Sequence, residues 1–364
     1  VLNPDSGAVI RELDIPSFNE VDTILKESSS YTKWRKLTLN QRCNLIVKFR
    51  KCIVKNKDKL EEVIKSETSK KDFDIFIECF SMFEHLKETP KIAKKFLKPS
   101  KRSSGLLKNK KAYVVYESLG VAAIISPWNY PLMTPISATI EALLAGNNVV
   151  LKPSEYTPLT SLYIKKLWDE HIGYNEAFNV VNGRGDVGFH LVQSKLTDII
   201  CFTGSTKIGK LIAKECAESL KPVILELGGK DPMIILKDAN IDRSVEAAVF
   251  AGMSNAGQTC ISVEEVFVEE EIFEDVRSKI SRKVKDMSAG NKDSMEIGPM
   301  IMDVNCSKVK EHIEENEKSS VIQGASIGHD RYIAPTIIVN PSDDSRIVNE
   351  ETFILMKVSR DIRI

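Results

Sequence analysis

The sequence predicts an α/β protein with two parallel-sheet domains, and three observations lead to this class. Between residues 121 and 236, short apolar runs alternate with longer helical segments. A second series of the same kind begins after Cys260. Before both, residues 20–95 repeat apolar side chains every three or four positions, as in Leu45, Phe49 and Ile53. Alternation of strands and helices is typical of parallel sheets covered by helices.

Each element follows from its local pattern, taken in chain order. The run 112–116 predicts a strand that forms half of a hairpin. In the first series, β-branched and other apolar runs predict strands at 121–125, 148–151, 178–181, 199–202 and 223–225. Helical spacing predicts helices at 131–145, 159–171 and 208–219. The first series continues with a strand at 233–236 and a helix at 242–253, and the second predicts strands at 263–268 and 332–339 and helices at 271–287 and 304–318.

The charge balance excludes several function classes. Lys and Arg number 51, as do Asp and Glu, so the formal net charge is zero. A whole-protein basic field for nucleic acid and an acidic tail are therefore both excluded, and we expect no nucleic-acid partner. Residues 91–111 hold nine basic residues and no acidic one. Their Pro, Ser and Gly content predicts a solvated loop surface; an anionic partner is the alternative.

The thiols and imidazoles form no recognisable metal or disulfide framework. Seven cysteines are scattered without a CxxC pair, and five histidines are scattered without an HExxH motif. We therefore expect no metal site and a reducing, cytoplasmic location. The opening residues have neither the basic nor the apolar region of a signal peptide, so we expect none. The uncharged stretch 118–140 is long enough to span a membrane, but its three prolines predict a buried strand followed by a functional loop instead.

Polar and glycine-rich motifs follow four of the expected strands, where parallel sheets bind ligands. Ser126-Pro-Trp-Asn-Tyr-Pro131 carries an amide donor in Asn129, although a proline-rich turn with a structural Asn is the simpler interpretation. Lys152-Pro-Ser-Glu155 could hold a ribose diol or a phosphate, or form a surface ion pair. Phe202-Thr-Gly-Ser-Thr-Lys-Ile-Gly209 leads into a helix whose N-terminus favours phosphate, although its glycine could serve only the turn.

The fourth motif is a pair of segments. Glu226-Leu-Gly-Gly-Lys230 places a carboxylate at a strand end beside two glycines. Gly257-Gln-Thr-Cys260 places a thiol in a polar, glycine-containing segment. A cysteine is more often an inert core residue than a nucleophile, and that interpretation suits the other six well. Cys260 differs because it does not lie on an apolar stripe.

Together and in this order, the five segments resemble the NAD(P)-dependent aldehyde dehydrogenase superfamily. Asn3-Pro-Asp-Ser-Gly7 and Glu350-Glu-Thr-Phe353 resemble the family's opening and a late element of it. The chain departs from the family after Phe353, where Ile354-Leu355 replace Gly-Pro, and at Glu265, where an Arg is common. The tail 357–364 does not resemble the family either. We therefore expect a C-terminally truncated member that is a poor enzyme by itself.

The resemblance implies an oxidoreductase that converts an aldehyde into a carboxylic acid with NAD(P). Cys260 is implied to attack the aldehyde as a thiolate, Asn129 to hold the oxyanion, and Glu226 to activate the water that hydrolyses the thioester. NAD is expected in preference to NADP, because the Glu155 carboxylate would repel a 2′-phosphate. The resemblance implies twelve cofactor-binding residues: Ser126, Pro127, Trp128, Lys152, Ser154, Glu155, Gly204, Ser205, Gly209, Leu227, Glu351 and Phe353.

The resemblance also implies a domain organisation. Residues 1–102 and 119–227 would form a Rossmann-like NAD-binding domain, 103–118 an oligomerisation hairpin, and 228–364 an incomplete catalytic domain. The full-length protein is expected to form a homodimer or homotetramer. Two other functions stay open: a catalytically impaired family member acting as a binding or structural protein, and a CoA-acylating dehydrogenase, which the presence of Glu226 disfavours. The aldehyde itself is not indicated.

Overall fold

The computed structural model describes residues 1–316, 319–352 and 355–359 and divides into two compact units. The first unit consists of Val1, Arg11–Ile64 and Phe76–Leu227, and the second of Leu2–Ile10, Lys65–Ile75 and Gly228–Ile364. From the sequence we expected 1–102 wholly in the first domain, but the structure groups 2–10 and 65–75 with the second. Asn3 donates to the Ser66 carbonyl at 2.9 Å, and the Tyr332 hydroxyl donates to Asp5. Such contacts between distant segments leave no local pattern.

The N-terminal region forms four helices, as its periodicity predicts: α1 (Phe18–Ser30), α2 (Leu39–Lys55), α3 (Lys57–Thr68) and α4 (Asp72–Phe96). Capping boxes fix where the first two begin. Ser17 and Glu20 cap α1 reciprocally, and Thr38 and Gln41 do the same for α2. Each capping box is made by two residues three positions apart, so the local sequence specifies where α1 and α2 begin.

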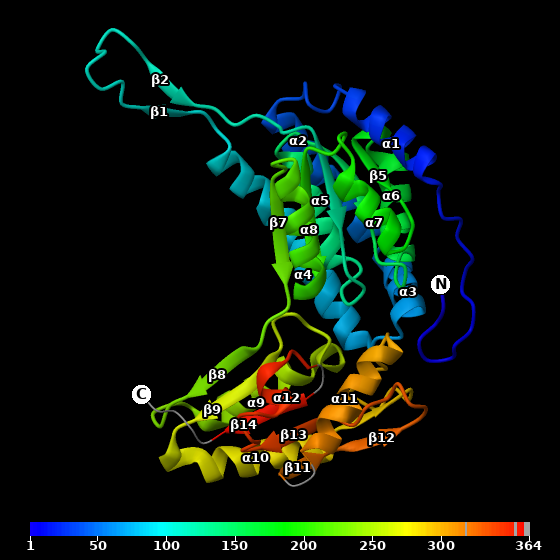
Figure 1. The fold of residues 1–364 in the computed structure, drawn as a ribbon, viewed down its shortest axis with the longest axis vertical. Helices are drawn as coiled ribbons and strands as arrows, with labels where there is room; N and C mark the ends of the chain where they lie inside the picture. Colours follow the sequence, from blue (N-terminus) through cyan, green and yellow to red (C-terminus); the bar gives the residue numbers. More distant parts are fainter. Residues whose placement is uncertain (317–318, 353–354, 360–364) are drawn as a thin grey trace. The chain divides into compact units, whose positions relative to one another are not determined.

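A five-stranded parallel sheet forms the centre of the first unit (Figure 1). Its strands are β3 (Val121–Ile125), β4 (Asn148–Lys152), β5 (Phe178–Val180), β6 (Ile199–Gly204) and β7 (Val223–Leu227), in the order β5-β4-β3-β6-β7. The order reverses direction between β3 and β6. In such sheets a crevice opens at this switch point, beyond the carboxyl ends of the strands.

Helices cover both faces of this sheet. They are α5 (Met133–Leu144), α6 (Leu159–His171), α7 (Gly185–Gln193) and α8 (Thr206–Glu218), with a 3₁₀ turn at Asn175–Ala177. α1, α7 and α8 share one buried apolar cluster with β3, β4 and β6. Right-handed connections through α5 and α6 place these two helices on the other face. Helix α7 was not predicted, because its two glycines weaken the helical pattern.

A separate antiparallel hairpin belongs to the first unit. It pairs β1 (Ser100–Arg102) with β2 (Ala112–Val114) and stands apart from the five-stranded sheet (Figure 1). Its first strand begins at Ser100, before the expected hairpin boundary at 103. Apolar side chains of its second half are exposed, among them Tyr113, Val115 and Tyr116.

The second unit holds a mixed five-stranded sheet in the order β11-β13-β14-β9-β8. The strands are β8 (Asp231–Ile235), β9 (Val263–Val268), β11 (Ser320–Gln323), β13 (Thr336–Val339) and β14 (Leu355–Ser359), and only β11 runs antiparallel to its neighbour. β13 is shorter than the expected strand 332–339, since Pro335 has no N–H for the ladder. β14, a strand that was not predicted, lies between β13 and β9.

Helices α9 (Ile241–Met253), α10 (Phe273–Asp286), α11 (Asp303–Glu315) and α12 (Arg346–Asn349) accompany this sheet. Short 3₁₀ turns lie at Ser254–Gly257 and Glu270–Ile272, and β10 (Ser288–Gly290) pairs with β12 (Ala325–Ile327). One buried cluster joins α9 and α10 to β9, β13 and β14. In the described part of the chain, no helix is long and apolar enough to cross a membrane.

Candidate active site

The candidate residues fall into two groups, one in each unit. In the first unit, Asn129 lies in the bend between β3 and α5 and is half-buried. Glu78 of α4 fixes the end of this bend, since its Oε1 accepts the N–H groups of Leu132 at 2.8 Å and Met133 at 3.1 Å. A carboxylate at a helix N-terminus also interacts favourably with the helix dipole. The carbonyl of Trp128 accepts the Thr157 hydroxyl at 3.2 Å, so the bend is held on both sides of Asn129.

The end of β4 brings Lys152 and Glu155 together. Lys152 is 3% exposed, and its Nζ lies 3.7 Å from Glu155 Oε2 and 3.0 Å from the Pro153 carbonyl. Burial lowers the pKa of Lys152, while Glu155 opposes that shift. Ser154 is buried, and its hydroxyl accepts the Tyr156 N–H. Ser126, buried at the end of β3, donates its N–H to the Lys152 carbonyl at 3.1 Å, which joins the two strand ends.

The end of β6 leads into α8 through Gly204 and Ser205. Ser205 is the N-cap of α8, with its hydroxyl accepting the Ile208 N–H, and it is exposed. Gly209 is buried against β7, where a Cβ would stand 2.6 Å from Cδ2 of Leu227. Glycine therefore lets the helix lie this close to the Leu227 side chain in its present position.

These strand ends fit a dinucleotide cofactor. β4, β3 and β6 are neighbours in the sheet, so their carboxyl ends lie along one edge. An ammonium with a carboxylate suits a ribose diol, and the N-terminus of α8 offers backbone N–H groups and a favourable dipole to a pyrophosphate. Half-buried Pro127 and Trp128 stand at the same edge, after β3.

Glu226 lies near the end of β7, opposite Thr203 of β6 in the ladder, and is exposed. β7 is the edge strand of the sheet and alternates half-buried with exposed residues. Burial raises the pKa of Cys201 to about 11, with Glu141 and Glu226 adding to the shift. Cys201 is therefore a protonated thiol at neutral pH, which agrees with an inert role.

In the second unit, Cys260 stands at an exposed turn between the 3₁₀ segment Ser254–Gly257 and β9. It is the exposed one of the seven cysteines, all of which lie within the described residues. The three residues Asn255, Ala256 and Gly257 are left-handed, with φ of 55°, 56° and 64°. For a non-glycine residue this conformation costs about 1–3 kcal/mol and persists where surrounding contacts enforce it.

Gln258 supplies those contacts, and sequence reasoning did not single it out. It is 1% exposed, and its Oε1 accepts the Ile301 N–H at 3.0 Å while its Nε2 donates to the Asn255 carbonyl at 3.0 Å. Asn255 in turn donates from Nδ2 to the Gln258 carbonyl, and its N–H reaches Asp74 Oδ1 at 3.0 Å. An amide two residues before the thiol was the available signal, and only its burial shows that it holds the turn.

Glu351 lies close to the glycines of the segment Glu226-Leu-Gly-Gly-Lys230. Gly228 is so near that a Cβ built on it would overlap the Glu351 carboxylate. Burial raises the pKa of Glu351, and Lys308 and Lys230 oppose the shift. Phe353, the other expected residue of this element, lies outside the described residues.

One departure from the family pattern, Glu265 in the second unit, has a defined partner. Glu265, which departs from the family at its position, pairs with Lys357 of the adjacent β14 at 3.0 Å, and both are largely buried. The carboxylate found where the family commonly has Arg is therefore paired with a lysine of the tail that does not resemble the family.

Across the described ranges, no group of three or more His, Cys, Asp or Glu residues could hold a metal ion.

The fold and these sites define a class of protein: two α/β units, one with strand ends suited to a dinucleotide and one presenting a cysteine at an exposed turn. The chain belongs to the aldehyde dehydrogenase family, whose model matches residues 1–354.

Individual relatives agree with this membership. A protein of Mycolicibacterium smegmatis, named provisionally as an NADP⁺-dependent succinate-semialdehyde dehydrogenase, is 34% identical over 90% of this chain and 65% of its own length. A glutarate-semialdehyde dehydrogenase of Pseudomonas putida is 30% identical over 97% of this chain and 74% of its own. This chain thus spans about two thirds to three quarters of the length of these curated relatives.

Solved structures show the same fold. Betaine aldehyde dehydrogenase of Staphylococcus aureus, in complex with NAD⁺, matches with a TM-score of 0.91 and 26% identity over 100% of this chain and 77% of that one. An aldehyde dehydrogenase of Brucella melitensis matches with a TM-score of 0.93 and 27% identity, covering 76% of that chain.

Proposed function

We propose that this chain oxidises an aldehyde to a carboxylic acid with NAD, by covalent catalysis at Cys260. The observation that carries the proposal is the turn that presents Cys260. It is the exposed cysteine, and buried Gln258 and Asn255 fix the left-handed backbone leading to it. A strained backbone costs free energy, and a surface cysteine without a function would need no such strain beside it.

In the proposed reaction, the Cys260 thiolate attacks the aldehyde carbon. The Asn129 side-chain amide and the Cys260 N–H donate to the oxygen as it becomes negative, and losing one such donor typically costs about 100- to 1000-fold in rate. A bound nicotinamide cofactor supplies the hydride acceptor. Glu226 takes a proton from the water that attacks the resulting thioester on Cys260, which releases the acid and restores the thiolate.

The first unit is proposed as the cofactor-binding domain and the second, from Gly228, as the catalytic domain. Lys152 and Glu155 would hold a ribose, with Ser126, Pro127, Trp128 and Ser154 beside them. Gly204, Ser205, Gly209 and Leu227 would form the pyrophosphate site, and Glu351 and Phe353 would contact the nicotinamide end. We propose NAD because the Glu155 carboxylate is partly exposed beside Lys152, where it would repel a 2′-phosphate.

The proposed activity is tested by following NADH absorbance with a panel of aldehydes that includes semialdehydes and glyceraldehyde, with and without CoA. We expect CoA-independent formation of NADH. The Cys260→Ala variant should lose turnover while still enhancing NADH fluorescence on binding. Substantial turnover by Cys260→Ala would remove Cys260 from the mechanism, and a strict need for CoA would replace hydrolysis by acyl transfer.

We further propose that the whole protein assembles as a homodimer or homotetramer through the hairpin around residues 103–118. Its exposed Tyr113, Val115 and Tyr116 support this, because exposed apolar side chains gathered on a hairpin suit a protein contact. Sedimentation analysis should show a dimer or tetramer, and Tyr113→Ser with Tyr116→Ser should shift it toward the monomer. An oligomer unaffected by these changes would place the interface elsewhere.

A further inference from the structure

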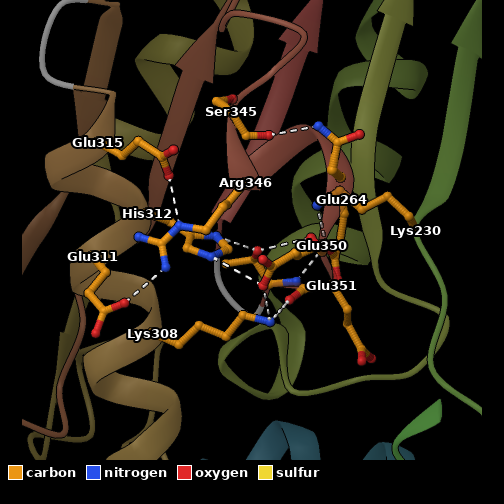
Figure 2. Close-up of polar contacts among 12 residues, drawn as sticks. Lys230, Glu264, Lys308, Glu311, His312, Glu315, Ser345, Arg346, Glu350 and Glu351 are labelled. Carbon is orange, nitrogen blue, oxygen red and sulfur yellow. Dashed lines mark hydrogen bonds and ion pairs between the residues drawn. The ribbon is translucent and has the colours of Figure 1, made fainter. Parts of the chain in front are cut away.

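The segment Glu350–Thr352 joins α12 to β14 and carries Glu351. Glu350 and the two residues after it form no regular element of their own, so backbone ladders do not fix this segment. Its position depends instead on side chains that reach it from β9 and α11, and Lys230 of the loop before β8 pairs with the one from β9 (Figure 2). Such support holds a functional carboxylate in a defined position, because neighbouring side chains fix the backbone that carries it.

Glu264 of β9 makes one of the buried contacts to this segment. It is 2% exposed, and its Oε2 accepts both the Thr352 N–H at 2.8 Å and the Lys230 ammonium at 2.5 Å. One carboxylate oxygen therefore links the end of the Glu226–Lys230 motif to the residue directly after Glu351. Figure 2 shows Glu264 of β9 and Lys230, directly before β8, beside Glu350 and Glu351.

Helix α11 holds the same segment from the other side. Lys308 Nζ donates to the Glu351 carbonyl at 2.8 Å and lies 3.1 Å from the Glu350 carboxylate. His312, fully buried, shares a hydrogen bond with the Thr352 hydroxyl through Nδ1 at 2.8 Å. The backbone around Glu351 is thus bonded at its own carbonyl and at the following N–H.

Burying the Glu264 carboxylate is costly even with an ammonium beside it, since desolvation offsets much of the attraction. The neighbouring pair Glu265–Lys357 is a natural comparison. It lies on the other face of β9, is similarly buried, and joins Glu265 of β9 to Lys357 of β14. The Lys230–Glu264 pair differs because its shared oxygen also bonds the backbone beside Glu351.

We propose that Glu264, clamped by Lys230, is a positioning residue that fixes the Glu350–Thr352 segment and so holds the Glu351 carboxylate toward the cofactor. The effect on the cofactor rests on the proposed function, whereas the effect on the segment does not. Glu264 touches no reacting atom in this proposal and acts through the Thr352 N–H.

The test uses the Glu264→Gln variant of the full chain. Gln keeps the size of the side chain but carries no negative charge. Its contacts with the Lys230 ammonium and the Thr352 N–H should therefore be weaker. Hydrogen exchange in the peptide covering residues 346–352 should speed up without any cofactor present. NADH affinity, followed by fluorescence, should fall about tenfold, the order expected from losing one charge-assisted hydrogen bond. In steady-state assays the KM for NAD should rise more than kcat falls.

Glu265→Gln is the matched control, because it breaks a comparable buried pair one residue away. It should lower the melting temperature to a similar degree but leave exchange at 346–352 and NADH affinity unchanged. Equal effects of both variants on exchange would show a general loosening of the sheet and overturn the proposal. Unchanged exchange in Glu264→Gln would overturn it as well. If the unmodified chain binds no NADH, the proposed function fails, and the exchange comparison still decides the positioning role.

Discussion

Gly228 and Glu351 lie 123 positions apart in sequence, yet no side chain can be added at Gly228 without overlapping the Glu351 carboxylate. This contact gives a physical reason for glycine at this position of the Glu226–Lys230 motif. It also brings the start of the long second-unit segment, at Gly228, together with a residue near the other end of that segment.

Gly228→Ala is expected to displace the Glu351 carboxylate and weaken NADH binding by about tenfold, or 1.4 kcal/mol. Gly229→Ala is the matched control, because a Cβ there would stand 3.3 Å from Asp231 Oδ1 and needs only a small adjustment. NADH fluorescence titrations of both variants provide the measurement. Equal losses of NADH affinity in both variants would mean that the motif tolerates no side chain at either position. Contact with Glu351 would then not explain the glycine at position 228.

Glu226→Gln should slow hydrolysis of the thioester more than its formation. Gln keeps the shape but cannot take a proton from water, and general-base catalysis typically contributes about 100- to 10,000-fold. A rapid-mixing experiment should show a burst of NADH followed by slow turnover. Loss of the burst itself would mean that Glu226 acts on the Cys260 thiol.

Gln258→Leu should destabilise the Cys260 turn. It leaves the buried Ile301 N–H and the Asn255 carbonyl without the amide they bond, at a cost of about 1–3 kcal/mol for each unpaired group. The alkylation rate of Cys260 by iodoacetamide, measured by peptide mass spectrometry, should change, while Cys201 serves as an internal reference in the other unit. An unchanged Cys260 rate in a destabilised variant would show that the turn does not depend on Gln258.

The pH dependence of stability should carry a signature of His312. Burial, together with Lys308 and Arg346, lowers the pKa of His312 to about 4 from an ordinary value of 6.5, against the opposing effect of Glu350. The imidazole stays neutral in the folded chain while the unfolded chain takes up a proton. Its stabilising contribution is therefore fully present above pH 6.5 and is lost as the pH falls toward 4.

His312→Gln should remove this contribution, so thermal unfolding between pH 7 and pH 5 should show a smaller decrease in the variant than in the unmodified chain. Glu264 acts in the opposite sense, because burial raises its pKa to about 7 and the folded chain takes up that proton first. Comparing the two chains at each pH cancels the effect of Glu264. Parallel pH profiles would contradict a buried neutral His312.

Glu155→Gln should increase the use of NADP relative to NAD. Removing one negative charge beside the ribose site lowers the repulsion of a 2′-phosphate, while Lys152 stays in place 3.7 Å away. The ratio of kcat/KM for the two cofactors is the measurement, and Glu170→Gln, on the exposed end of α6, is a charge-matched control. A ratio that moves equally in both variants would reflect net charge and not the site.

Much of the fold could be predicted because its signals are local. The helix 159–171 and the strand 263–268 have the predicted bounds, since apolar spacing sets both. The parallel sheet of the first unit likewise follows from the order of its apolar runs, and the family resemblance is confirmed by the match over residues 1–354. The candidate residues were found as motifs for the same reason: each lies in a short segment of contiguous residues, and several of these segments come directly after a strand.

Sequence alone therefore determined the fold class, the family and the segments that carry candidate chemistry, because these depend on neighbours along the chain. Tertiary structure decided what those segments touch. It placed 2–10 and 65–75 in the second unit, inserted β14 between β13 and β9, and gave Glu265 its partner in Lys357. The link from Lys230 through Glu264 to Thr352 joins residues 34 and 88 positions apart. Contacts of this kind depend on how distant segments pack, and packing leaves no periodic trace in the order of the amino acids.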